Sequence, residues 1–207
     1  MSDTLGVILA GGLATRMGGG DKGRLEIGGT SILQRVIDRL APQVSGMVLN
    51  ANGDASRFSD FALPVASDSI DGYAGPLAGV LAGMDWAAEQ GASHVVSVAA
   101  DTPFFPVDLV HRLKEATQEQ DAPIALAATP DPKRGIARQP TFGLWPVELR
   151  DDLRRELKDG LRKVVLWTDK FGTAMAVFEV GPFDPFLNVN TPEDLELARS
   201  IESRHHP

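Results

Sequence analysis

Apolar residues along the chain form short runs that alternate with segments of helical periodicity. The first run, LGVILA at residues 5–10, is followed by glycine, as is typical of a strand buried on both faces of a parallel sheet. Further short apolar or alternating runs predict the remaining strands: residues 47–50, 63–66, 94–100, 124–128, 141–145 and 175–180, with a strand end at residues 186–190.

The segments between these runs carry the start and stop signals of helices. Ser31 and Gln34 form a Ser-x-x-Gln capping pattern ahead of apolar residues at helical spacing. Pro76 suits a first helical turn, Gly91 suits a helix end, and Thr191 suits an N-cap. These signals predict the helices: residues 31–40, 76–90, 106–119, 148–158, and a last one after Thr191.

Alternation of strands with helices predicts an α/β fold, with a mostly parallel sheet covered on both faces. We expect a single-domain, Rossmann-like three-layer arrangement over residues 1–207. Ligands of such folds bind beyond the carboxyl ends of the strands. Polar or glycine residues follow the predicted strands and are expected at that one edge: residues 9–12, 50–52, 68, 101 and 188–190.

Composition narrows the chemistry further. The 207 residues include no cysteine and four histidines, which excludes disulfides, thiolate metal sites and a cysteine nucleophile. We expect a cytoplasmic protein without a signal peptide or a membrane span. The net charge of −8 and the lack of a basic stripe argue against a nucleic-acid partner, and we expect a monomer.

Residues 9–23, LAGGLATRMGGGDKG, hold six glycines and two cations directly after the first strand. A P-loop would need serine or threonine after Lys22, where the chain has Gly23. The G-x-G-x-x-G match at residues 18–23 neither directly follows a strand nor opens a helix, because the first strand ends at Ala10 and the next helix begins only near Ser31. We interpret Gly11 and Gly12 as a backbone nest for phosphate, followed by a flap carrying Arg16 and Lys22. The alternative is an ordinary surface loop with solvated charges.

The motifs LAGG-x3-RMGG-x-DKG (residues 9–23), NAN (50–52), SD (67–68), GPLAG (75–79), DTP (101–103) and NVNTPEDL (188–195) follow one another along essentially the whole chain. In order and approximate spacing they resemble the molybdenum cofactor guanylyltransferases, which belong to the nucleotidyltransferases with a nucleotide-diphospho-sugar transferase-like fold. The resemblance implies transfer of GMP from Mg-GTP to the terminal phosphate of molybdopterin, with release of pyrophosphate. It also implies transient binding to molybdenum-insertion proteins or apo-molybdoenzymes.

The resemblance also implies a set of site residues. The residues implied to contact GTP are Leu9, Ala10, Gly11, Gly12, Lys22, Asn50, Asp68 and Asp101. Asp101 would hold Mg²⁺, with Mn²⁺ as a substitute, and Arg16 and Lys22 would act with it in catalysis. The remaining active-site matches are Gly75, Gly79, Asn188 and Asn190. One departure is Gln139, which precedes Pro140 where family members often have His-Pro.

Each assignment has a structural alternative. Asp101 could cap the helix after its strand, Asp68 could be a turn residue, and Gly75 and Gly79 could permit close helix packing. Asn188 and Asn190 occupy alternate positions of a predicted strand and should face one side, or else form a strand-end turn. We hypothesise that the Asp68 carboxylate accepts from N1–H and N2–H₂ of guanine.

The residues from 129 to 140, TPDPKRGIARQP, read as a basic loop. Its cations, Lys133, Arg134 and Arg138, would meet the anionic acceptor or a partner protein, or would be solvated. Other functions stay open at this stage. They are a molybdopterin cytidylyltransferase, another nucleotidyltransferase, and a nucleotide-binding module without turnover.

Overall fold

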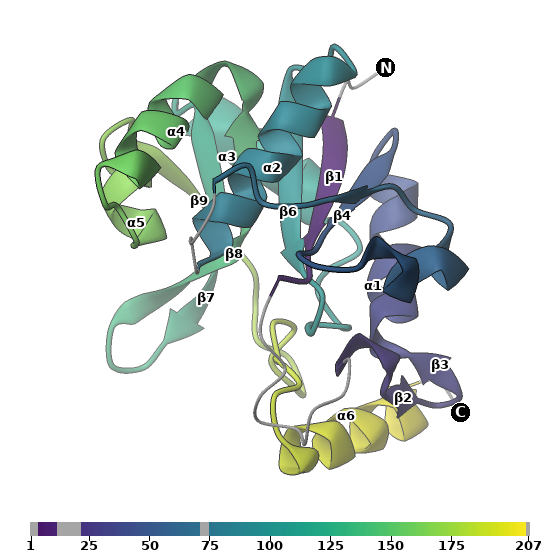
Figure 1. Ribbon diagram of the computed structural model, residues 1–207. Coiled ribbons are helices and arrows are strands. Elements are labelled where there is room, and N and C mark those ends of the chain that lie inside the picture. Colours follow the sequence, from purple (N-terminus) through teal and green to yellow (C-terminus); the bar gives the residue numbers. More distant parts are fainter. Residues whose placement is uncertain (1–3, 12–21, 71–74, 206–207) are drawn as a thin grey trace.

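The computed structural model describes residues 4–11, 22–70 and 75–205 (Figure 1). A seven-stranded sheet with the order β5-β4-β1-β6-β8-β7-β9 forms its centre. Its strands are β1 (Thr4–Leu9), β4 (Met47–Asn50), β5 (Val65–Ala66), β6 (His94–Ala99), β7 (Ile124–Asp131), β8 (Gly135–Pro146) and β9 (Thr173–Val177). Neighbours run parallel except where β8 pairs with β6 and β7. The predicted α/β fold with a mostly parallel sheet is therefore confirmed.

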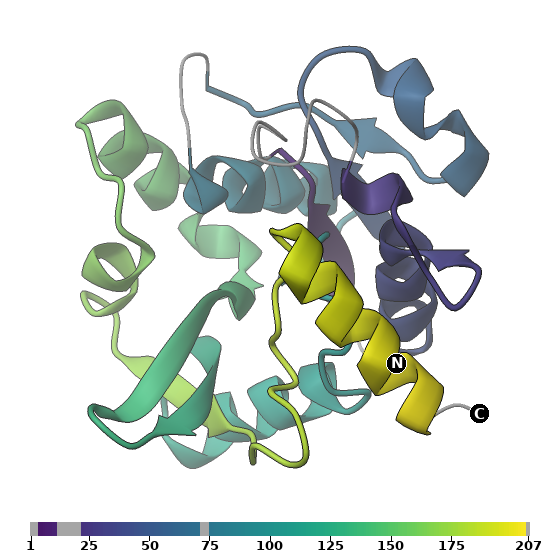
Figure 2. The ribbon, with the colours of Figure 1, turned by 90° about the horizontal axis from the view of Figure 1, so that it is seen from below.

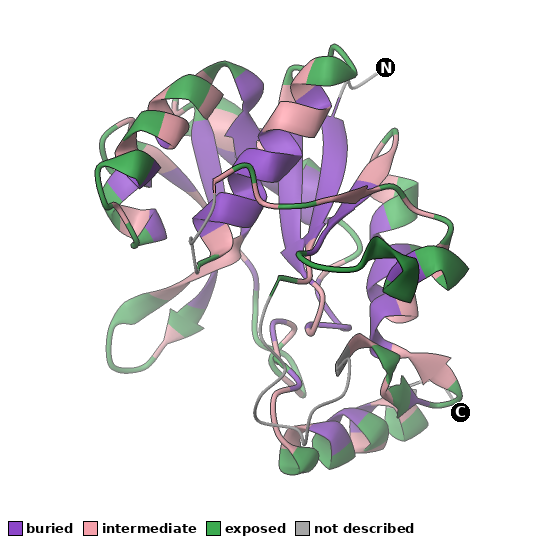
Figure 3. Cartoon of the chain, viewed as in Figure 1, coloured by how far each residue is buried: buried purple, intermediate pink, exposed green. Residues whose placement is uncertain are grey.

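Helices cover both faces of the sheet and bury most of it, except the projecting end of the β7–β8 hairpin (Figures 1 and 3). One face packs against α1 (Ile32–Leu40) and α3 (Leu109–Glu119). The other packs against α2 (Pro76–Glu89), α4 (Arg150–Lys158) and α5 (Val164–Thr168). Successive side chains of a strand point to opposite faces, so Val7 joins the second core and Ile8 the first, both fully buried.

Local signals in the sequence position two of these helices. The Ser31 hydroxyl accepts the backbone N–H of Gln34 at 3.2 Å, which confirms Ser31 as the N-cap of α1, whereas the Gln34 side chain donates to Asp38 Oδ1 at 2.7 Å. Gly91 has φ +72° just beyond α2, a left-handed conformation that glycine adopts without strain. The short helix α5 and the 3₁₀ segment η3 (Ala55–Phe61) were not predicted.

A third, smaller core joins the last helix to a short hairpin. The elements are β2 (Glu26–Ile27), β3 (Thr30–Ser31) and α6 (Pro192–His205), which lie side by side in Figures 1 and 2. Arg35 fastens them, because its guanidinium donates to the Ile27 carbonyl oxygen at 2.9 Å and to Glu202 Oε1 at 2.8 Å. Helix α6 is thereby tied to the amino-terminal half of the chain.

The predicted basic loop is instead the end of a β-hairpin, so that prediction is wrong. Asp131 Oδ1 accepts the N–H groups of Lys133 and Arg134 at 2.8 and 2.7 Å, and Gly135 has φ +76°, which together close a tight turn. The pairing of β7 with β8 shifts register between Leu126 and Ala127. The irregularity opposite that step accommodates Pro140, whose missing N–H would otherwise interrupt the ladder.

The predicted strand end at residues 186–190 is also wrong. This segment has no ladder, and one backbone bond, from Val189 N–H to the Asp101 carbonyl oxygen at 2.8 Å, joins it to the turn that follows β6. Extended apolar-polar alternation predicts a strand only if a neighbouring edge is free to pair, and here β8 occupies the edge of β6. Within the described ranges, no helix is both long and apolar enough to cross a membrane.

Candidate active site

The carboxyl end of β1 lies between two groups of polar side chains. Backbone bonds join it to both neighbours: Ala10 N–H donates to the Asn50 carbonyl oxygen at 2.9 Å, and Ala100 N–H donates to the Leu9 carbonyl oxygen at 3.1 Å. The group beside β4 consists of Asn50, Asn52 and Asp68, here called the β4 group. The group beside β6 consists of Asp101, Thr102 and Asn188, here called the β6 group.

In the β4 group, two amides hold one carboxylate. Asn50 Nδ2 donates to Asp68 Oδ1 at 3.0 Å, and Asn52 Nδ2 donates to Asp68 Oδ2 at 2.8 Å. The backbone N–H of Asp68 donates to Asn52 Oδ1 at 2.9 Å. Asp68 therefore bonds to the end of β4. Asn52 was not among the predicted contacts, although the NAN motif contains it.

Close packing of α2 positions Asn50, which is 2% exposed. A Cβ at Gly79 would lie 2.3 Å from Asn50 Oδ1, so only glycine leaves room for this amide. A Cβ at Gly83, one turn later, would lie 2.7 Å from Val7 Cβ. The geometry supports the packing interpretation of Gly79. Gly75 is the N-cap of α2, with φ +157° and open space around the position of a Cβ.

The β6 group joins two distant parts of the chain. The fully buried Thr102 hydroxyl lies 2.5 Å from Asn188 Oδ1 and 3.3 Å from Asp101 Oδ1. Helix α3 begins only at Leu109, with Asp108 at its N-cap, so Asp101 does not cap that helix. Asp101 and Asn188 thus share one hydroxyl at the edge predicted to bind ligand.

The N-terminus of α6 fixes the segment that follows Asn188. Asp194 Oδ2 accepts the N–H groups of Asn190 and Thr191 at 2.9 and 2.8 Å. Thr191 Oγ1 accepts the N–H of Asp194 at 3.2 Å, which confirms Thr191 as the N-cap. The cap places Asn190 next to the β6 group, two residues beyond Asn188.

The glycine-rich segment is described only at its ends. Gly11 follows β1, and a Cβ there would lie 3.5 Å from Asn50 Oδ1. Gly12 and Arg16 lie outside the described residues, as does the side chain of Lys22, whose backbone begins the 3₁₀ turn η1 (Lys22–Arg24). The predicted nest and flap therefore stay predictions.

Arg24, which the sequence did not single out, anchors the far end of this segment. Its guanidinium donates to both carboxylate oxygens of Asp60, at 2.8 and 2.9 Å, and lies 5.7 Å from the centre of the Phe61 ring. The pair with Arg24 lowers the pKa of the Asp60 carboxyl. Arg24 therefore joins the end of the glycine-rich segment to η3, which follows Asn52 in the chain.

The residues at this edge fit a hard divalent cation bound through one carboxylate. Among the described residues, no three His, Cys, Asp or Glu side chains cluster into a ready-made metal cage. Mg²⁺ commonly binds to one or two carboxylates, with phosphate oxygens and water completing its octahedron. Asp101, at the edge predicted to bind ligand, can supply one such carboxylate.

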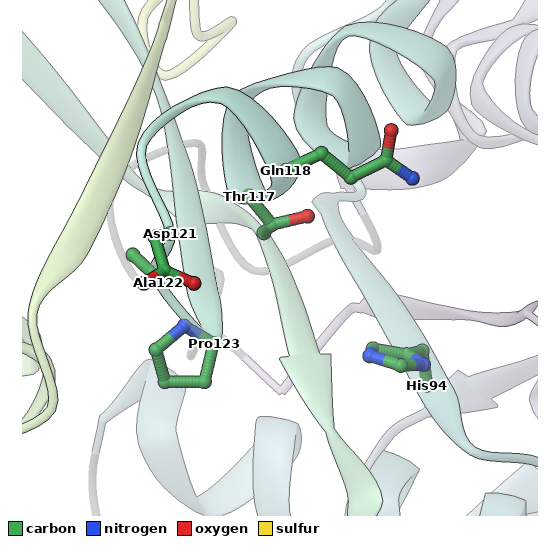
Figure 4. A pocket seen from close by; sticks show the side chains of 6 residues that line it. All are labelled: His94, Thr117, Gln118, Asp121, Ala122 and Pro123. Atoms are coloured by element: carbon green, nitrogen blue, oxygen red, sulfur yellow. The ribbon is translucent and has the colours of Figure 1, made fainter.

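A separate cavity of about 380 Å³ lies at the opposite edge of the sheet (Figure 4). His94, the first residue of β6, borders it together with Thr117 and Gln118 of α3 and residues 121–123. Burial lowers the pKa of His94, Lys114 adds to this effect, and Glu148 opposes it. None of the predicted site residues lines this cavity, so we assign it no part in nucleotide binding.

Comparison with known proteins identifies the family of this chain. Residues 6–171 match the model of the MobA-like NTP transferase domain. A molybdenum cofactor guanylyltransferase of Rhodopseudomonas palustris (strain BisB5) is 52% identical over 204 residues, covering 97% of this chain and 95% of the relative. One of Bradyrhizobium sp. (strain ORS 278) is 50% identical over 199 residues, covering 95% and 92%.

Solved structures share the fold at lower identity. Molybdopterin-guanine dinucleotide biosynthesis protein A from Archaeoglobus fulgidus has a TM-score of 0.72 and 21% identity, covering 97% of this chain and 99% of that one. A CMP:2-keto-3-deoxy-manno-octonic acid synthetase in complex with CTP has a TM-score of 0.74 and 14% identity, covering 98% and 99%. The fold is thus that of the nucleotide-diphospho-sugar transferases.

Proposed function

The chain belongs to the MobA-like NTP transferase family, and from this premise we propose that it is a molybdenum cofactor guanylyltransferase. It transfers GMP from GTP to the terminal phosphate of molybdopterin, and pyrophosphate leaves. The observation that carries this proposal is the pair of groups flanking β1. One presents a carboxylate held by two amides, suited to a base, and the other presents a carboxylate suited to a phosphate-bound cation.

Asp68 is the proposed reader of guanine. An ionised carboxylate has about four acceptor sites, and the amides of Asn50 and Asn52 each occupy only one of them, which leaves room for further donors. Guanine offers two adjacent donors, N1–H and N2–H₂, which adenine lacks. Asn50 and Asn52 would then hold the carboxylate, while Leu9, Ala10 and Gly11 contact the nucleotide where the chain leaves β1.

Phosphate binding is assigned to the glycine-rich segment and to the β6 group. Gly11 and Gly12 would direct N–H groups at phosphate oxygens, and Arg16 and Lys22 would offset charge there. Asp101 would hold Mg²⁺, or Mn²⁺, which when bound neutralises charge that develops on the α-phosphate. Asn188, Asn190 and the N-terminus of α2 at Gly75 would border the two phosphates that react.

The acceptor is a phosphate monoester that is already largely ionised at neutral pH. It needs no strong base to become a nucleophile, and positioning with charge neutralisation is sufficient. A reaction that needs no strong base is consistent with a chain that has no cysteine and four histidines. The same composition supports a cytoplasmic location.

Pyrophosphate release with each of the four nucleoside triphosphates and Mg²⁺, with and without molybdopterin, tests the proposal. We expect release that requires both GTP and molybdopterin. Release with CTP instead would identify a cytidylyltransferase. Tight GTP binding with no release from a competent acceptor would identify a binding module without turnover.

The β7–β8 hairpin is the proposed contact for the acceptor. Because β7 runs parallel to β6 in the sheet, its turn projects from the edge that carries Asp101 (Figures 1 and 2). Lys133 and Arg134 are exposed at this turn, while Arg138 pairs with Asp169 at 2.7 Å. Replacing Lys133 and Arg134 with alanine should raise the KM for molybdopterin and leave GTP binding unchanged. Equal loss of both would count against this role.

A further inference from the structure

We propose that Asn52 is a positioning residue that sets the choice of base by orienting the Asp68 carboxylate. The inference rests on the proposed function, since it assigns guanine to Asp68, but it concerns a different residue. Asn52 does not itself face the base in this scheme. It holds the carboxylate in the plane in which both oxygens can accept parallel donors.

The hydrogen bonds between Asn52 and Asp68 are reciprocal. Asn52 Oδ1 accepts the backbone N–H of Asp68 at 2.9 Å, and Asn52 Nδ2 donates to Asp68 Oδ2 at 2.8 Å. These two bonds exclude the flipped amide. After a flip, an NH₂ group would face an N–H, and a carbonyl oxygen would face a carboxylate oxygen. The amide of Asn52 is therefore locked by the backbone of the residue that it orients.

The Asn50 amide fixes the other oxygen of the Asp68 carboxylate. Asn50 Nδ2 donates to Asp68 Oδ1 at 3.0 Å, so each carboxylate oxygen is held by a different asparagine. Two such bonds determine the rotation of the carboxylate about its last torsion, which is otherwise broad. A planar carboxylate with both oxygens fixed matches two parallel N–H donors, the geometry that strengthens bidentate recognition.

Asn52 is the better residue to test of the two amides. Asn50 is buried, lies under Gly79 and also donates to the Ala66 carbonyl oxygen at 3.2 Å, so its loss would disturb the end of the sheet. Asn52 is exposed, and its side-chain hydrogen bonds go to Asp68. Its replacement therefore removes orientation without removing core packing.

The test compares GTP with ITP, whose base keeps N1–H but lacks the N2 amino group. We expect the full-length enzyme to bind Mg-GTP about tenfold more tightly than Mg-ITP, because a bond to a charged group is lost. In Asn52→Ala we expect GTP affinity to fall about tenfold and ITP affinity to change less than about threefold. The preference for GTP should therefore nearly disappear, with the melting temperature unchanged.

Asp54→Ala is the matched control. Asp54 lies in the same exposed segment and caps η3 by accepting the Ser56 N–H at 2.9 Å. This variant loosens the segment without touching Asp68, and we expect it to keep the GTP preference. An Asn52→Ala enzyme that keeps the wild-type preference would overturn the inference. So would equal loss of preference in Asp54→Ala.

Binding constants are measured without the acceptor, which separates this inference from the proposed function. Failure to release pyrophosphate with molybdopterin would refute the proposed reaction, while the two binding ratios would still decide the role of Asn52. A wild-type enzyme that binds GTP and ITP equally would refute the inference, even if the reaction proceeds.

Discussion

The two polar groups that flank β1 are held in place by different means. The β4 group lies within 19 consecutive residues, 50–68, and is joined by hydrogen bonds between partly exposed side chains and one buried amide. The β6 group joins residues 86 positions apart through the buried Thr102 hydroxyl, and through a backbone bond to Val189. The β4 group can therefore be altered by exchanging side chains, whereas the β6 group depends on how α6 docks.

This difference separates base selection from phosphate chemistry. Substitutions in the β4 group should change which nucleotide binds. Substitutions in the β6 group, or under α6, should change turnover while the preferred base stays the same. The four experiments below test this separation, beginning with the largest expected effect.

Asp101→Asn should lower turnover by about 10²–10³-fold, since a charged ligand near the α-phosphate is replaced by a neutral one. The GTP-over-ITP binding preference should stay at the wild-type value, measured by equilibrium binding alongside pyrophosphate release. Asp108→Asn is the control, because Asp108 is at the N-cap of α3 but makes no side-chain capping bond. A changed base preference in Asp101→Asn would mean that the two groups do not act separately.

Gly79→Ala and Gly83→Ala form a pair that isolates Asn50. Each added Cβ overlaps atoms of the sheet, and this overlap should lower the free energy of unfolding by about 1–3 kcal/mol. The higher helix propensity of alanine should offset up to ~1 kcal/mol of that loss. Only Gly79→Ala displaces the Asn50 amide, because the Gly83 position faces Val7. Denaturant unfolding should therefore show a similar loss of stability in the two variants, whereas GTP affinity should fall only in Gly79→Ala. Equal affinity losses would refute the link through Asn50.

Glu202→Ala should loosen α6 from α1. The Arg35–Glu202 pair is largely buried, with side-chain exposures of 18% and 15%, so we expect a loss of about 1–2 kcal/mol, between the values typical of exposed and buried pairs. The Asn188 segment should then hold Asp101 less firmly. We expect a lower kcat with an unchanged base preference, and Glu196→Ala, on an exposed position of the same helix, as a silent control. Loss of base preference would contradict the separation.

His94→Gln should leave both groups unaffected and change only the response to acid. The pKa of His94 lies below its ordinary value of 6.5, so the unfolded chain binds the proton more readily. Stability is therefore retained above about pH 6.5 and falls as pH drops through that value. The variant should lose less stability between pH 7 and pH 5, measured by unfolding at each pH. A larger loss of stability on acidification in the variant than in the wild type would contradict the lowered pKa of His94.

The amino-terminal half was easier to predict than the carboxyl-terminal half. Residues 47–50 form β4 as predicted, and α1 and α2 begin where Ser31 and Pro76 indicate, because caps and apolar periodicity act over a few residues. The β7–β8 hairpin was misjudged because prolines and charges suggested a loop. Its strand character depends on a register shift that only pairing creates.

The sequence by itself determined the α/β fold, the edge at which its polar residues gather, and the family to which its motifs point. Apolar periodicity and strand-end residues carry this information locally. Only the tertiary structure decided that Asn52 bonds to Asp68, that Thr102 meets Asn188, and that Gly79 makes room for Asn50. Such contacts depend on distances between elements far apart in the chain, and those distances exist only once the helices have packed on the sheet.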